Sequence, residues 1–166
     1  MTDQRRPFIK RIALHTVSCL CLAIFSDISP AQPVGDVAVV VHPEVPVDNL
    51  SFAEVRKLLL GDRQFWAPNL RVTLLIRAPA AREREVVLKT VYQMTEAQFR
   101  QYWIAKVFRA DVPAGPKIVY SNEMATELVQ LLPGSIAFVS AAQVPSTLKI
   151  LRVDGRLPGE KGYPLH

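Results

Sequence analysis

Few side chains in this 166-residue sequence have types and spacings that could do chemistry, and the histidines stand alone. His42 follows an apolar run, but no second His, Cys or carboxylate is placed to join it at metal-ligand spacing, and His166 is the last residue. A catalytic His also needs a nucleophile and a third group that orients it, and the sequence proposes neither. The sequence therefore predicts no catalytic residue, no metal site and no cofactor, and the chain is not expected to be an enzyme.

Binding of a small oxyanion is a second kind of chemistry to consider. It needs backbone N–H groups at a helix start, hydroxyl donors and an Arg. Arg77 ends a predicted strand shortly before a predicted helix, but the junction includes no Ser, Thr or Gly among Ala80, Ala81, Arg82 and Glu83. Arg77 is then either an anion contact or, more simply, a solvated charge at a strand end. The Arg-Glu-Arg-Glu run that begins at Arg82 is most simply a solvated helix start.

The first 31 residues differ in composition from the rest of the chain. A short basic segment, Arg5–Arg11, precedes a largely apolar run of fourteen residues, Ile12–Phe25, and small residues lead up to Ala31. This order is typical of a secretory signal peptide, and the apolar run is short for a membrane span. We therefore expect a signal peptide over residues 1–31, cleaved near Ala31, and a periplasmic protein. The alternative is a buried N-terminal helix.

Residues 1–31 also bear on the export route and on the net charge of the chain. Its RRPFIK run is similar to the twin-arginine export signal, but Gln4 stands where that pattern prefers Ser or Thr, so the Sec route stays open. Without residues 1–31 the chain has 16 Lys and Arg against 13 Asp and Glu, a net charge of +3, and no cysteine. So small an excess, without a basic run interleaved with aromatics, does not indicate nucleic-acid binding.

Strand and helix patterns alternate along residues 32–166, which form one predicted domain with a Gly- and Pro-rich tail, residues 154–166. Ser51 and Glu54 form a capping box at a helix start, and Gly61 ends that helix. Further helices are predicted over 82–93, after Thr95 with a second capping box, and after Ser121. Strands are predicted at Asp36–Pro43, Leu70–Arg77, Lys117–Tyr120, Ser135–Val139 and Leu148–Val153. The alternation predicts an α/β layer fold.

Apolar stripes predict the buried faces of two helices. In the helix after Thr95 the stripe is Phe99, Trp103 and Val107, for which core packing is a simpler interpretation than a binding face. In the helix after Ser121 the stripe is Met124, Leu128 and Leu131. Trp66 lies in a predicted loop, where it can pack against the preceding helix or meet a partner.

Three segments together resemble the phosphate-type (PstS-like) substrate-binding proteins of ABC transporters. They are LSFAEVRKLLLGDRQFW, LIRAPAAREREVVL and NEMATELVQLLPGSIAFVS. In that family a helix ending in Leu-Gly-Lys precedes a Trp and a strand that ends in Arg, and a Leu-Pro-Gly-Ala-Ile-Gly-Tyr-Val junction follows. Leu60–Asp62 and Trp66 match the first pattern, and Leu132–Val139 match the second. Gly162–Leu165 is similar to the segment by which the family's chain leaves its second lobe.

The resemblance implies a type 2 periplasmic-binding fold, an α/β three-layer lobe with a central, mostly parallel sheet flanked by helices. The family has two lobes with the ligand between them, and this chain has length for one, so a single-lobe member is implied. The family's ligand contacts come from a strand-end Arg and a Ser-Gly-Thr loop that opens a helix. They map to Arg77, Ala81, Arg82 and Glu83, where the hydroxyl donors are absent, which argues against phosphate.

Two functions remain open at this point. The first is a non-catalytic periplasmic solute-binding-like protein that holds a small anion and serves an ABC permease. The second is a periplasmic interaction or accessory domain that has lost ligand binding, with another envelope protein or a second copy of the chain as its partner.

Overall fold

The first strand, β1 (Val37–Val41), has five successive residues with no exposed surface. It belongs to the unit Ala31–His166, of which the computed structural model describes residues 35–166. The predicted signal peptide lies outside the described residues. A strand that is apolar at every position is expected where both faces of a sheet are covered, because successive side chains point to opposite faces.

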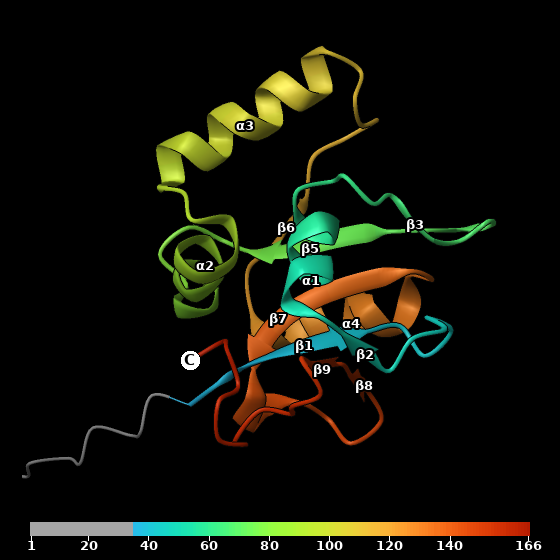
Figure 1. The fold of residues 1–166 in the computed structure, drawn as a ribbon, viewed down its shortest axis with the longest axis vertical. Helices are drawn as coiled ribbons and strands as arrows, with labels where there is room; N and C mark the ends of the chain where they lie inside the picture. Colours follow the sequence, from blue (N-terminus) through green and yellow to red (C-terminus); the bar gives the residue numbers. More distant parts are fainter. Residues whose placement is uncertain (1–34) are drawn as a thin grey trace, which may run out of the picture. The chain divides into compact units, whose positions relative to one another are not determined.

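The main sheet has five strands in the order β6-β5-β7-β1-β8 (Figure 1). Their bounds are Thr73–Arg77 for β5, Lys117–Val119 for β6, Ser135–Ser140 for β7 and Lys149–Ile150 for β8. The strands β6, β5 and β7 run parallel, whereas β1 is antiparallel to both β7 and β8. The sheet is therefore parallel on one side and antiparallel on the other.

Two apolar cores lie on the two faces of this sheet. Val37, Val39 and Val41 join one core with residues of α1, α2 and α3, whereas Ala38 and Val40 join the other core beneath α4. This alternation places β1 in the middle layer of three. The expected three-layer α/β lobe is thus confirmed.

Side-chain caps set the starts of α1, α3 and α4, as the sequence predicts. Capping boxes at Ser51 and Thr95 open α1 (Phe52–Leu59) and α3 (Glu96–Phe108), and Ser121 caps α4 (Asn122–Leu131). The predicted helix 82–93 divides into α2 (Arg82–Val87) and a π-helical turn, η1 (Leu88–Tyr92). None of the helices within residues 35–166 is long and apolar enough to cross a membrane.

The predicted buried faces are only partly correct. Phe99 and Trp103 of α3 are buried, but Val107 is 41% exposed. In the last turn of the helix Lys106 faces the lobe instead, where its Nζ donates to the Leu60 carbonyl. In α4 the prediction of Met124 and Leu131 is wrong, since Leu131 is 73% exposed. The small side chains of Ala125 and Val129 are buried instead, and their size lets the helix approach the sheet closely.

Short strands complete the lobe. The pair β2 (Asn49–Leu50) and β9 (Arg152–Val153) is parallel, and β3 (Phe65–Ala67) pairs with β4 (Leu70–Arg71). The predicted strands 70–77 and 148–153 are each interrupted, at Val72 and Leu151 respectively. The predicted loop around Trp66 is wrong, because this residue lies in β3.

The turn at Pro133 and Gly134, between α4 and β7, contacts β3 and β5. The Gly134 carbonyl accepts hydrogen bonds from the indole Nε1 of Trp66 at 2.8 Å and from the Thr73 amide at 3.0 Å. Gly134 has φ +73°, and a Cβ there would lie 2.1 Å from the carbonyl oxygen of Arg71. Trp66 is therefore a core residue, and the turn requires glycine for its dihedral angle and for its close backbone contact.

The Gly- and Pro-rich tail is also part of the core. The Tyr163 hydroxyl donates to the Val37 carbonyl at 2.8 Å, and the Val37 amide donates to the Leu165 carbonyl at 2.8 Å. Tyr163 and Leu165 are almost fully buried. The end of the described chain thus closes the edge of the core beside β1.

Gly134→Ala is expected to destabilise the protein far more than Gly155→Ala. Gly155 also has a positive φ, but no atom lies within 4 Å of its Cβ position. Gly155→Ala should therefore lose only the free energy needed to hold alanine at a positive φ, about 1 kcal/mol. The clash at Gly134 adds about 2 kcal/mol or more. Urea unfolding of both variants measures the difference, and equal losses would contradict the close-contact explanation.

Candidate functional site

The carboxyl ends of β5, β6 and β7 meet at one edge of the sheet, where open α/β sheets usually hold their ligands. Arg77 ends β5, Asn122 opens α4 just after β6, and Gln143 lies in the short 3-10 helix η2 (Ala141–Gln143) after β7. The helix α2 begins five residues after Arg77. The predicted ligand contacts therefore lie at this carboxyl edge.

Arg77 is not the solvated strand-end charge that the simpler interpretation expects. Its side chain is 12% exposed, and its Nε lies 3.5 Å from Oε2 of Glu83. Its Nε and Nη1 are buried without a hydrogen-bond partner among the described residues. Arg77 thus sits as a nearly buried cation beside a carboxylate supplied by the chain itself.

Glu83 is held in place from several elements. It is 7% exposed, and its Oε1 accepts a hydrogen bond from Nδ2 of Asn122 at 3.1 Å. Nδ2 of Asn122 also contacts Oε1 of Gln143, and its Oδ1 accepts from the Ser140 amide at 3.4 Å. The prediction of a solvated helix start is therefore wrong at this position, because Glu83 belongs to a buried network between α2, α4 and β7.

The other two predicted contacts are arranged differently. Ala81 is the N-cap of α2 and provides no side-chain cap, and its own amide donates to the Ala78 carbonyl at 3.2 Å. Arg82 has a buried Nη2 without a hydrogen-bond partner among the described residues, and no carboxylate of residues 35–166 forms an ion pair with it. The structure thus brings Arg77 and Glu83 together, while Ala81 keeps its amide in a local turn.

Arg84 is a buried charge whose role sequence reasoning missed. It is 3% exposed, donates twice to the carboxylate of Glu96 at 2.8 Å, and donates from Nη1 to the Arg77 carbonyl at 2.8 Å. Its guanidinium also lies over the Phe99 ring, 4.8 Å from the centroid. Local spacing carries no signal for this pair, since the two residues lie twelve positions apart in different helices.

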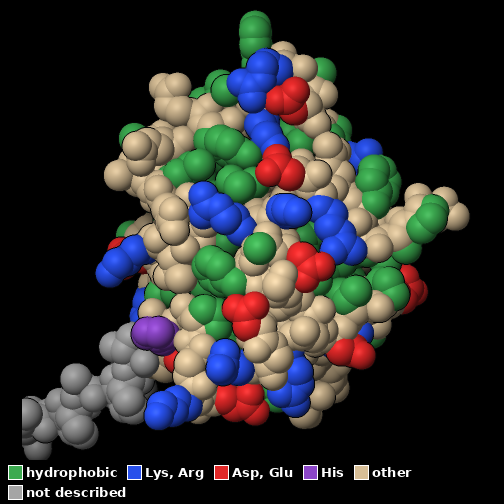
Figure 2. Space-filling model, in the orientation of Figure 1, with side chains coloured by type: hydrophobic (Ala, Val, Ile, Leu, Met, Phe, Trp, Pro, Cys, Tyr) green, Lys and Arg blue, Asp and Glu red, His purple; other side chains and the backbone are tan. Residues whose placement is uncertain are grey.

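A second carboxylate lies near Arg77. The pKa of Glu123 is held below its usual value, mainly by its own backbone amide and the Ser121 hydroxyl, with a smaller contribution from the positive charge of Arg77. The carboxyl edge thus combines cations with nearby carboxylates. On the face shown in Figure 2, Lys and Arg side chains are likewise interspersed with Asp and Glu.

Within residues 35–166 no group of three or more His, Cys, Asp or Glu side chains is placed to hold a metal ion. The network around Arg77 contains guanidinium, carboxylate and amide groups, and no nucleophile there is paired with a general base. The side chains at this edge can therefore bind a charged or polar group.

The Arg84–Glu96 pair makes stability depend on acid pH. The pKa of Glu96 is lowered, chiefly by its hydrogen bonds with Arg84. A lowered folded-state pKa stabilises the protein above the unfolded pKa, about 4.3, and this contribution is lost as the pH falls through the folded value. Glu96→Gln should cost about 2 kcal/mol at pH 7, and the difference from wild type should shrink towards pH 3.

Urea unfolding from pH 7 to pH 3 measures this effect. Glu127→Gln is the control, because Glu127 is an exposed carboxylate on α4 with no ion pair in the described structure. A Glu96→Gln difference that stays constant over this pH range would contradict the proposed linkage.

Solved structures of phosphate transport proteins share this fold. The ABC-type phosphate transport receptor from Vibrio cholerae aligns with a TM-score of 0.60 and 19% identity, over 75% of this chain and 48% of that chain. PstS from Borrelia burgdorferi aligns with a TM-score of 0.59 and 21% identity, over 75% and 49%. A Clostridium perfringens protein assigned as a phosphate ABC transporter substrate-binding protein, solved with bound phosphate, aligns at 0.59 and 16% identity, over 73% and 46%.

A scan against protein-family models and a search of curated proteins gave no match. The chain spans about half the length of the solved structures that it matches. At these identities the likeness shows the fold alone. In fold, the chain resembles about one half of the phosphate ABC transporter substrate-binding proteins.

Proposed function

We propose that this chain is an exported, non-catalytic domain of the substrate-binding-protein fold that acts through protein interaction, with its own Glu83 occupying the anion position beside Arg77. The observation that carries the proposal is the 3.5 Å approach of Glu83 Oε2 to Arg77 Nε, with side chains 9% and 12% exposed. The carboxylate takes the place that an external oxyanion would need.

Electrostatics supports this assignment. Two like unit charges 4 Å apart repel by about 4 kcal/mol at an effective dielectric constant of 20. A phosphate dianion at Arg77 would therefore be opposed by Glu83, which Asn122 holds in position. The backbone amide of Ala81, which donates to Ala78, is also already engaged. Phosphate is accordingly not the proposed ligand of this domain.

The lobe also leaves the carboxyl edge without a second wall of its own. Small-molecule sites usually bury 70–90% of the ligand. Residues 35–166 form one lobe beside this edge, and we infer that another lobe or another protein covers it. We propose an envelope protein, such as an ABC permease, or a second copy of this chain as the partner, and light scattering of the purified protein distinguishes the second copy from a monomer.

Weak binding of a small anion is the second candidate function. It is favoured by Nη1 of Arg77 and Nη2 of Arg82, which are buried without hydrogen-bond partners among the described residues. Buried donors of this kind normally meet an acceptor, either a protein group, water or a ligand. A monoanion that shares Arg77 with Glu83 would satisfy them.

Glu83→Gln separates the two candidates. The substitution removes the internal carboxylate and leaves Arg77 unpaired, which should cost about 3 kcal/mol in stability. We expect phosphate and sulfate to leave the melting temperature of the wild type unchanged and to raise that of Glu83→Gln. Calorimetric titration of the same two proteins measures the binding directly.

Glu85→Gln is the matched control, since Glu85 is an exposed carboxylate in the same helix. Heat released when the wild type meets phosphate, sulfate or an organic anion, and lost in Arg77→Gln, would favour the second candidate. A Glu83→Gln variant that folds and does not respond to any anion would contradict the assignment of Glu83 to an anion position.

The periplasmic location is a separate proposal that rests on the amino-terminal segment, outside the described residues. The basic segment Arg5–Arg11 and the apolar run after it support export. We expect the protein isolated from the periplasm to begin near Gln32, and mass spectrometry of the intact chain checks this. A mature protein that retains residues 1–31 would contradict cleavage near Ala31.

A further inference from the structure

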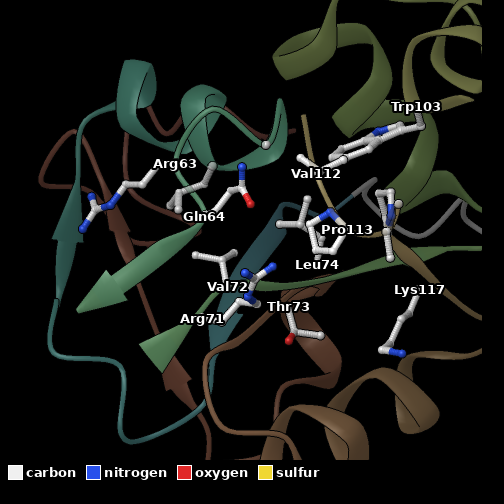
Figure 3. Close-up of a pocket in the computed structure, with 15 residues that line it drawn as sticks. Arg63, Gln64, Arg71, Val72, Thr73, Leu74, Trp103, Val112, Pro113 and Lys117 are labelled. Carbon is white, nitrogen blue, oxygen red and sulfur yellow. The ribbon is translucent and has the colours of Figure 1, made fainter. Parts of the chain in front are cut away.

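A cavity of about 150 Å³ lies at the end of β5 away from Arg77 (Figure 3). It is lined by residues that lead into β5, among them Arg71 and Thr73, and by the loop that leads into β6. Because a strand rises about 3.3 Å per residue, this amino end lies about 13 Å from Arg77. The cavity is thus distinct from the carboxyl edge described above.

The walls of the cavity are apolar and well supported. Trp103, Val112 and Leu74 contribute apolar side chains to the lining. Trp103 is 6% exposed and Val112 is 5% exposed, so these two walls are fixed by the core behind them. Nε2 of Gln64 donates to the Asp111 carbonyl at 2.8 Å, which joins the loop after α1 to the loop after α3.

The charged residues of the lining are all basic: Arg63, Arg71 and Lys117. Figure 3 shows the guanidinium of Arg63 directed away from the other lining residues, and it lies over the Trp66 ring. The guanidinium of Arg71 lies among the lining residues in the same view and over the Phe65 ring, 4.9 Å from its centroid. No carboxylate of residues 35–166 forms an ion pair with Arg71 or Lys117.

Two carboxylates near these residues in sequence are already paired. Asp62 accepts from Nζ of Lys106 at 2.5 Å, and Asp111 lies 2.9 Å from Nη2 of Arg109. This leaves the positive charges of Arg71 and Lys117 uncompensated beside an apolar cavity. Such a combination suits a ligand that has one anionic end and one apolar end.

We propose that this cavity binds a small planar carboxylate, with the carboxylate at Arg71 and the apolar body against Trp103 and Leu74, while Lys117 adds positive charge to the lining. A cavity of this volume has the size that holds one benzene ring. Arg recognises a carboxylate through two parallel hydrogen bonds, and an aromatic body packs favourably on an indole ring. Inorganic phosphate offers no apolar body and would leave the apolar walls uncovered.

Sodium benzoate, titrated calorimetrically into the purified protein, is the probe. We expect binding with a Kd of about 1 mM or tighter. Benzamide has the same ring without the charge and should bind about tenfold more weakly. Arg71→Gln should weaken benzoate binding about tenfold. Lys117→Gln should weaken it less, because its ammonium lies apart from Arg71 (Figure 3) and acts only through its charge.

Lys161→Gln is the matched control, because Lys161 is an exposed cation in the tail, away from the cavity lining. Gly115→Leu is a second test, since a Cβ at Gly115 would meet Cβ and Cε3 of Trp103 at ordinary contact distances, 3.8 and 3.9 Å. The added side chain should fill the cavity and abolish benzoate binding, with thermal unfolding as the check on folding. Arg71→Gln and Lys117→Gln test the proposal even if Gly115→Leu does not fold.

Three results would overturn the proposal: no benzoate binding, equal binding of benzamide and benzoate, or benzoate binding unchanged in Arg71→Gln. Benzoate binding that responds to Glu83→Gln and not to Arg71→Gln would also overturn it, by placing the anion at the carboxyl edge. Failure here leaves the role of Glu83 unaffected, because the two sites share no residue.

Discussion

Burial of β1 on both faces is the constraint on which the rest of this lobe depends. Val37 to Val41 have no exposed surface, and β7, paired along the full length of β1, is nearly as deeply buried. Each face needs its own apolar cover, which α4 provides on one side and α1, α2 and α3 provide on the other. The tail completes the edge through Tyr163 and Leu165, so segments far apart in sequence must assemble together.

Two of the three segments that carry the family resemblance contact each other in the structure. Trp66 belongs to the first and Gly134 to the third, and the indole donates to the glycine carbonyl at 2.8 Å. The same carbonyl accepts from Thr73, which begins β5. The family resemblance therefore lies in residues that hold the scaffold of the lobe together. The contact between Trp66 and Gly134 lies at the amino end of β5, while the ligand contacts expected from the resemblance lie at the other end.

The two ends of β5 differ in their electrostatic arrangement. At the carboxyl end, Arg77 is paired with Glu83, and the Arg77 carbonyl is held by Arg84, itself paired with Glu96. Buried charges need such partners, because an isolated ion in the interior is costly. At the amino end, Arg71 and Lys117 line a cavity without a carboxylate in its lining. The fold alone therefore does not determine what either end of β5 can bind, and the particular side chains at each end do.

The sequence by itself determined the local features of this protein. Capping residues such as Ser51 and Thr95, the apolar run of β1 and the positive φ of Gly134 are local features, so their patterns are visible in the chain. The strand order, the rotation of α4 and the partners of Glu83 and Arg84 were decided only by the tertiary structure. These depend on contacts between distant segments, and a charge run looks the same in sequence whether its side chains meet water or a buried partner.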